Sequence, residues 1–167
     1  MRYRFSQLML VVPLLALAMR VGSSPTANLS YLVLAVYALR GRAQAVQSLA
    51  LTWLFLMINN SIAPPASLAA FGRYAIFFAA GLSMIIHKPA KPATRQVRLL
   101  LNMTIALGAF LIVHSLLFSS VVDVSLLKAI SWALVATSLV AGWSGVSQTH
   151  REILQMELFA LLALTLI

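Results

Sequence analysis

Residues Leu111–Lys128 read LIVHSLLFSSVVDVSLLK: the end of one apolar helix, a short polar turn and the start of the next. The segment holds His114, Asp123 and Lys128, in a chain with only three acidic residues and three histidines. Charge beside hydrocarbon is costly, so ionisable residues in such a segment are functional candidates. The simpler interpretation is that Asp123 or Ser125 caps the second helix and that Lys128 extends to the membrane interface.

The composition extends this apolar pattern to the whole chain. Of its 167 residues, 62% are hydrophobic and 9% are charged, and the mean hydropathy is +0.96. A soluble domain has about 45–50% apolar and about 25% charged residues. In lipid every backbone polar group must be satisfied within the protein, as helices do. We therefore predict an all-α integral membrane protein.

Seven apolar runs predict a polytopic transmembrane bundle of about seven membrane segments, forming a single domain over residues 1–167. The first two runs are shorter than the ~20 residues needed to span. The last is still apolar at Ile167, so we expect a truncated helix and the N-terminal part of a longer protein. The runs are Leu8–Met19, Ala27–Leu39, Ala45–Ile62, Leu68–Ile86, Leu99–Phe118, Val124–Trp143 and the segment from Ile153 onward.

The positive charges predict the orientation, because cytoplasmic loops carry an excess of Lys and Arg. With a cytoplasmic N-terminus and one crossing per run, nine of the twelve basic residues lie inside. The net charge of +9 does not indicate nucleic-acid binding, since the basic residues lie between apolar runs rather than along one polar face. The nine residues are Arg2, Arg4, Arg40, Arg42, Lys88, Lys91, Arg95, Arg98 and Arg151.

Arg20, Arg73 and Lys128 break this bias and fall in the outer half of the membrane, where His114 also lies. Asp123 is the only acidic residue predicted near them. Arg can clamp a phosphate bidentately and Lys can hold it as a point charge. We therefore predict Arg20, Arg73, His114 and Lys128 as contacts to a lipid-borne diphosphate. The alternative is that they reach ordinary lipid phosphates by snorkelling.

No complete active site is visible in the sequence. Asp123, Glu152 and Glu157 are the only carboxylates, and the last two are predicted at the cytoplasmic side, so no pair can act as acid and base across one sugar. The chain has no P-loop, GxGxxG or HExxH motif and no cysteine. We expect no catalytic residue, no metal site and no cofactor.

The run RLLLNMTIALGAFLIVHSLLFSSVVDVSLLKAISWALVATSLVAGW, Arg98–Trp143, resembles the middle membrane region of the O-antigen ligase and polymerase superfamily. The closest likeness is HSLLFS…VSLLKAISW, His114–Trp132, followed by AGWSGVS and a polar turn. The resemblance covers about the last two thirds of the chain. It implies a multi-pass protein of the bacterial inner membrane that takes part in cell-surface polysaccharide or exopolysaccharide biosynthesis.

Members of this superfamily transfer an undecaprenyl-diphosphate-linked glycan to an acceptor at the periplasmic face, without a nucleotide-sugar or an obligatory metal. The resemblance implies the lipid bilayer, that glycan and other polysaccharide-assembly membrane proteins as partners. The family's essential Arg and His residues lie in a large periplasmic loop with no counterpart here, so we expect this chain alone to be inactive as a glycosyltransferase. Two alternatives stay open: a small multi-pass permease or channel subunit, and a non-catalytic assembly partner of a polysaccharide export machine.

Overall fold

The computed structural model describes residues 2–22, 24–58, 68–89 and 92–165, and these residues form seven α-helices and no strand. The prediction of an all-α protein is therefore confirmed. The helices are α1 (Arg2–Gly22), α2 (Ser24–Ala38), α3 (Arg42–Ile58), α4 (Leu68–Ile86), α5 (Arg95–Phe118), α6 (Val122–Gly145) and α7 (Gln148–Thr165).

Each predicted run corresponds to one helix, but most helices begin before the apolar run does. The first helix has 21 residues rather than being short, whereas α2 has 15 residues, in line with the prediction of a short helix. Helix α3 begins at Arg42 instead of Ala45. Polar residues in a first helical turn do not interrupt the backbone ladder, so a hydropathy pattern alone underestimates helix length. The predicted end of the third run, at Ile62, lies outside the described residues.

Within the described part of the chain, two helices, α5 and α6, are long and apolar enough to cross a membrane. Each has 24 residues, and only 11% of its most apolar window is buried inside the protein. Large apolar side chains therefore cover the free surface of both helices, including Phe110, Leu117 and Phe118 on α5. Contiguous apolar surface of this kind is unfavourable in water. The surface of these two helices suits a lipid environment.

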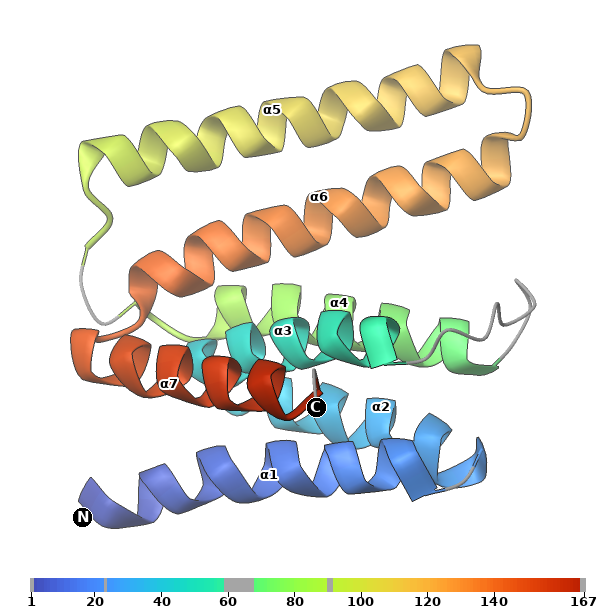
Figure 1. Ribbon diagram of the computed structural model, residues 1–167. Coiled ribbons are helices and arrows are strands. Elements are labelled where there is room, and N and C mark those ends of the chain that lie inside the picture. Colours follow the sequence, from blue (N-terminus) through green and yellow to red (C-terminus); the bar gives the residue numbers. More distant parts are fainter. Residues whose placement is uncertain (1, 23, 59–67, 90–91, 166–167) are drawn as a thin grey trace.

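The helices lie side by side and alternate in direction (Figure 1). Helix α5 packs against α6, which packs against α3 and α4; α2 follows, and then α1. Helix α7 packs against α3. The turns α2–α3, α4–α5 and α6–α7 lie at one end, which we call the basic end, and the turns α1–α2 and α5–α6 lie at the other, the far end (Figure 1).

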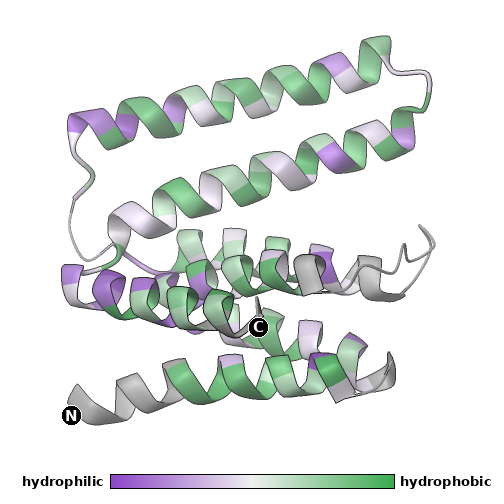
Figure 2. Ribbon diagram, in the orientation of Figure 1, coloured by the Kyte–Doolittle hydropathy of each residue, from purple (hydrophilic) through white to green (hydrophobic). Residues whose placement is uncertain are grey.

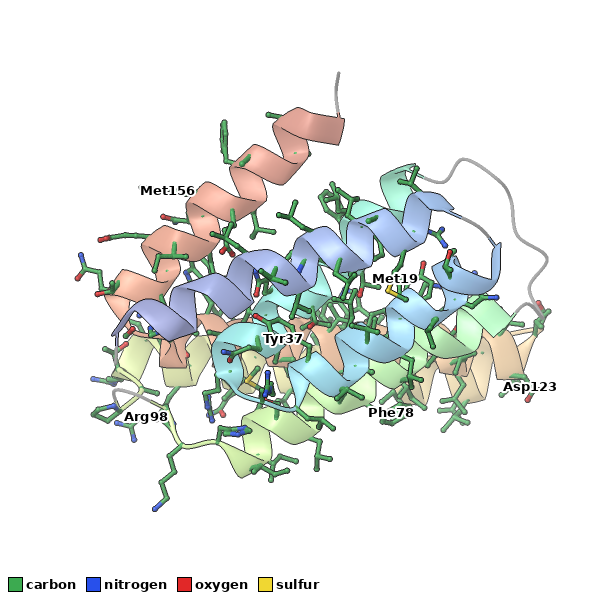
Figure 3. All side chains as sticks on the ribbon, turned by 90° about the horizontal axis from the view of Figure 1, so that it is seen from below. Met19, Tyr37, Phe78, Arg98, Asp123 and Met156 are labelled. Atoms are coloured by element: carbon green, nitrogen blue, oxygen red, sulfur yellow. The ribbon has the colours of Figure 1, made fainter. Side chains whose placement is uncertain are left out.

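Hydropathy follows this arrangement. Hydrophilic residues gather at the starts of α5 and α7, at the basic end, whereas the lengths of α5 and α6 are mostly apolar (Figure 2). Arg98 and Asp123 lie at opposite ends of the bundle (Figure 3).

The core is formed by α2, α3 and α4. Tyr31 and Leu34 of α2 pack with Phe55 of α3 and Ile76 of α4, and all four side chains are buried. The rings of Tyr31 and Phe55 meet edge-on with their centroids 6.2 Å apart, an arrangement that aromatic pairs favour. This core holds α1 on one side and α6 on the other.

The α5–α6 turn differs from the prediction. The N-cap of α6 is Val121, with φ −126° and ψ 77° and no side-chain cap, so the prediction that Asp123 or Ser125 caps this helix is wrong. Asp123 lies in the first turn instead, where a negative charge favours the helix dipole. The Ser125 hydroxyl donates to Ser115 Oγ of α5 at 3.0 Å and so joins the two helices. Ser119 Oγ accepts the Val121 N–H at 3.2 Å.

Helices α5 and α6 approach closely because Gly108 has no side chain. A Cβ built at Gly108 would lie 2.8 Å from Ala133 Cβ, too close for an ordinary contact. Small residues of this kind allow membrane helices to pack tightly.

We therefore expect Gly108→Leu to lower the free energy of unfolding in detergent by about 1–3 kcal/mol, because overpacking forces α5 away from α6. Ala109→Leu is the matched control, since Ala109 is exposed on α5. Unfolding monitored by circular dichroism should separate the two variants. Equal stability of both variants would show that this contact is not tight.

Candidate functional site

The predicted phosphate contacts begin with Arg20, at the end of α1. Its Cζ atom lies 5.4 Å from the centroid of the Tyr31 ring on α2, within the range of a cation–π contact. Tyr31 also packs against α4, because a Cβ built at Gly72 would lie 2.7 Å from Tyr31 Cβ. Arg73 is the next residue of α4 and is half-buried. Arg20 and Arg73 therefore lie on the two helices that pack on either side of Tyr31.

The register between α4 and α6 gives the level of Lys128. Both helices begin at the far end and run in the same direction (Figure 1). A Cβ built at Gly81 would lie 3.4 Å from Leu134 and 3.8 Å from Ser138, so Gly81 is level with the middle of that pair. Arg73 lies eight positions before Gly81, and Lys128 lies eight positions before the midpoint of Leu134 and Ser138. Arg73 and Lys128 are therefore at the same level along the bundle.

The register between α5 and α6 places His114 at a similar level. Ser115 and Ser125 are hydrogen-bonded across the two antiparallel helices. His114 precedes Ser115, and Lys128 lies one turn after Ser125, so the two are within about one turn, ~5.4 Å, along the bundle axis. Arg20, Arg73, His114 and Lys128 thus lie near one level at the far end.

These four residues lie on four different helices: Arg20 on α1, Arg73 on α4, His114 on α5 and Lys128 on α6. His114 and Lys128 are both exposed, on the α5–α6 hairpin. The His114 ring lies between Phe110 and Phe118 of its own helix, at centroid distances of 6.0 and 5.2 Å. Arg20 lies on α1, on the opposite side of the bundle from α5 (Figure 1). Basic side chains therefore lie on opposite sides of the bundle at the far end.

A buried chain of polar side chains, not predicted from the sequence, joins α2, α3 and α7. The hydroxyl of Tyr37 donates to Gln47 Oε1 at 2.8 Å, and Gln47 Nε2 donates to Glu157 Oε2 at 2.6 Å. Gln47 is fully buried and Glu157 is only 7% exposed. Glu157 Oε1 is also buried and has no hydrogen-bond partner among the described residues. Helix α7 begins at Gln148, so Glu157 lies more than two turns from the start of that helix.

The sequence of α3 indicates that this helix has a buried polar face. Gln44 is followed by buried polar residues three, four and eight positions later, which places them on one face of the helix. A polar stripe within an apolar run indicates contact with polar partners inside the bundle. These residues are Gln44, Gln47, Ser48 and Thr52.

We expect Glu157→Leu to lower the free energy of unfolding by about 1–3 kcal/mol, because it removes the carboxylate that accepts from the buried Gln47 amide at 2.6 Å. The triple variant Tyr37→Phe/Gln47→Leu/Glu157→Leu should recover part of this loss, since it removes all three of these polar groups together. Denaturant unfolding of the single and triple variants compares them. A triple variant less stable than the single one would contradict this interpretation.

Arg42, the first residue of α3, is the second feature that the sequence analysis missed. Its guanidinium donates to the carbonyl oxygens of His87 (2.6 Å) and Met84 (2.7 Å) near the end of α4, and of Ala141 (3.0 Å) near the end of α6. Helix C-termini carry partial negative charge, which a cation stabilises. One side chain therefore joins α3, α4 and α6 at the basic end.

We expect Arg42→Gln to lower the free energy of unfolding by about 2–5 kcal/mol, because a neutral amide cannot reach three carbonyls. Arg42→Lys should recover little of this loss, since an ammonium lacks the planar fork of a guanidinium. Arg40→Gln is the control, because Arg40 is exposed and its substitution should have a small effect. Thermal unfolding in detergent provides the comparison. Arg42→Gln as stable as Arg40→Gln would refute the structural role.

Among the described residues, no group of three or more His, Asp or Glu side chains is placed to hold a metal ion. The chemistry available at the far end is electrostatic: guanidinium and ammonium groups that can neutralise an anion, beside an imidazole that can hydrogen-bond to it. Comparison of the chain with protein-family models, with curated proteins and with solved structures found no match.

Proposed function

We propose that this chain is the N-terminal membrane part of an O-antigen ligase/polymerase-like protein. In this proposal it handles an undecaprenyl-diphosphate-linked glycan at the periplasmic face of the bacterial inner membrane, for cell-surface polysaccharide or exopolysaccharide biosynthesis. The observation that carries the proposal is the common level of Arg20, Arg73, His114 and Lys128 at the far end. Resemblance of His114–Trp132 to the superfamily supports it, since this segment forms the α5–α6 turn at that end.

The proposed orientation follows from the charges at the two ends. Arg40, Lys88, Arg95, Arg98 and Arg151 belong to the turns or helix starts of the basic end. By the positive-inside bias this end is cytoplasmic, all seven helices cross, and the far end faces the periplasm.

The proposed mechanism is electrostatic. A diphosphate carries several negative charges, which increase on the leaving group as the glycan departs. Cations fixed at the far end stabilise that developing charge more than the starting state, which lowers the barrier. Arg73, half-buried, can hold a phosphate bidentately, and Lys128 offers a point charge from the neighbouring helix. Activation of the acceptor is not assigned to any residue of this chain.

We expect Arg73→Ala/Lys128→Ala to weaken binding of undecaprenyl diphosphate in nanodiscs by roughly 30-fold, at about 1 kcal/mol for each cation near a membrane surface. The matched control is Arg95→Ala/Arg98→Ala, which removes the same charge from the basic end and should bind like the wild type. Undecaprenol, which lacks the diphosphate, should not distinguish the variants. Equal binding by the wild type and the Arg73/Lys128 variant would reject the site.

A small permease is the second candidate, and the Tyr37–Gln47–Glu157 chain favours it. An ionisable side chain inside a membrane domain is typical of transport and proton relays. In that case Glu157→Gln should abolish uptake in proteoliposomes while Arg73→Ala/Lys128→Ala leaves uptake unchanged, which is the reverse of the pattern expected for a lipid-diphosphate site.

A further inference from the structure

A cavity of about 330 Å³ opens at the basic end, where the turns α2–α3, α4–α5 and α6–α7 meet. Among its lining side chains five can carry positive charge and none is acidic. We call it the basic cavity. The five basic side chains that line it are Arg40, Arg42, His87, Lys88 and His150.

Several cavity residues are already engaged in the fold. Arg42 donates to three carbonyls. The ring of His87 contacts Ser83 through Nδ1, at 3.2 Å from Oγ, and the ring of His150 contacts Ser147 Oγ at 2.6 Å. Arg40 and Lys88 are exposed at the rim. An incoming anion would therefore meet Arg40 and Lys88 first, with the fixed charge of Arg42 behind them.

An apolar groove of about 390 Å³ lies between α4, α5 and α6. It shares a boundary with the basic cavity at Arg42, because Met84 and Ala141, whose carbonyls bind that guanidinium, also line the groove. The residues that define the groove are Phe78, Gly81, Met84, Leu101, Leu134 and Ala141.

The two spaces together match an amphiphile with an anionic head. The cavity provides positive charge without a competing carboxylate, and the groove is almost entirely apolar. Basic pockets between membrane helices are suited to phosphate headgroups of lipids, and the adjoining groove suits an acyl chain. A free phosphate would use the cavity alone and leave the groove without a role.

We propose that the basic cavity and the apolar groove bind one anionic phospholipid, with its phosphate at Arg40, Arg42 and Lys88 and an acyl chain along Gly81 and Leu134. This site lies at the opposite end of the bundle from Arg73 and Lys128 and does not depend on the function proposed for them. Its ligand belongs to the leaflet at the basic end.

Native mass spectrometry of the full chain with phosphatidylglycerol tests the proposal. Arg40→Ala/Lys88→Ala should weaken retention of phosphatidylglycerol by roughly 30-fold, at about fivefold for each basic residue. Arg95→Ala/Arg98→Ala removes equal charge from the same end outside the cavity and should retain the lipid like the wild type. Equal loss in both double variants, or loss in neither, would overturn the proposal.

Two further measurements distinguish binding of a lipid from binding of a free phosphate. Gly81→Leu should fill the groove and reduce phosphatidylglycerol retention, and the fold should tolerate it because a Cβ there is at ordinary contact distance, 3.4 Å, from Leu134. Phosphatidylcholine, which has no net charge, should be retained weakly by all variants. If inorganic phosphate displaces phosphatidylglycerol at equal concentration, or if Gly81→Leu retains it fully, the lipid assignment is wrong. The binding of undecaprenyl diphosphate should be unchanged in Arg40→Ala/Lys88→Ala.

Discussion

Three backbone carbonyls from two helices converge on a single guanidinium, that of Arg42. The C-terminal turns of a helix leave carbonyl groups without intrahelical donors, and in apolar surroundings such groups cost several kcal/mol each when left unpaired. Arg42 donates to such carbonyls at the end of α4 and to the Ala141 carbonyl of α6, which also accepts the Ser144 hydroxyl. Because its fork is planar, Arg42 sets the position of both helices relative to α3. The core of α2, α3 and α4, and the α5–α6 hairpin on the other side, are arranged around this junction.

The basic residues of this protein serve different purposes according to their position in the fold. Arg42 is held by carbonyls and is part of the architecture, whereas Arg40 and Lys88 beside it stay exposed. At the far end Arg20 lies against an aromatic ring and Arg73 is half-buried, but His114 and Lys128 face outward. The net charge of +9 therefore includes basic residues that stabilise the fold and basic residues that are accessible at the surface. Only the accessible ones can contribute to recognition of an anion.

The helices were predictable from the sequence because long apolar runs separated by Gly, Pro and charged residues leave few alternatives in lipid. The start of α6 was not predictable in the same way. Asp and Ser are common N-cap residues, yet Asp123 and Ser125 lie inside the first turns of α6, and this follows only from the backbone geometry. The sequence pattern also did not predict contacts between distant segments. Arg42 binds Ala141, 99 positions later, and Gln47 binds Glu157, 110 positions later. The spacing of Gln44, Gln47, Ser48 and Thr52 did indicate a buried polar face, but not its partner. For Arg20, Arg73, His114 and Lys128, the charge pattern predicted a shared end of the bundle, whereas their distribution over α1, α4, α5 and α6 depends on which helices are neighbours.

Helix α5 packs chiefly against α6, through Gly108 and Ala133 and through the serine pair Ser115 and Ser125. The hairpin is thus joined to the remaining helices mainly through α6. His114 and Lys128 belong to this hairpin, whereas Arg20 and Arg73 belong to α1 and α4. The separation between these two sets of residues is accordingly determined by how α6 packs against α3 and α4, and Arg42 holds that packing in place from the opposite end of the bundle.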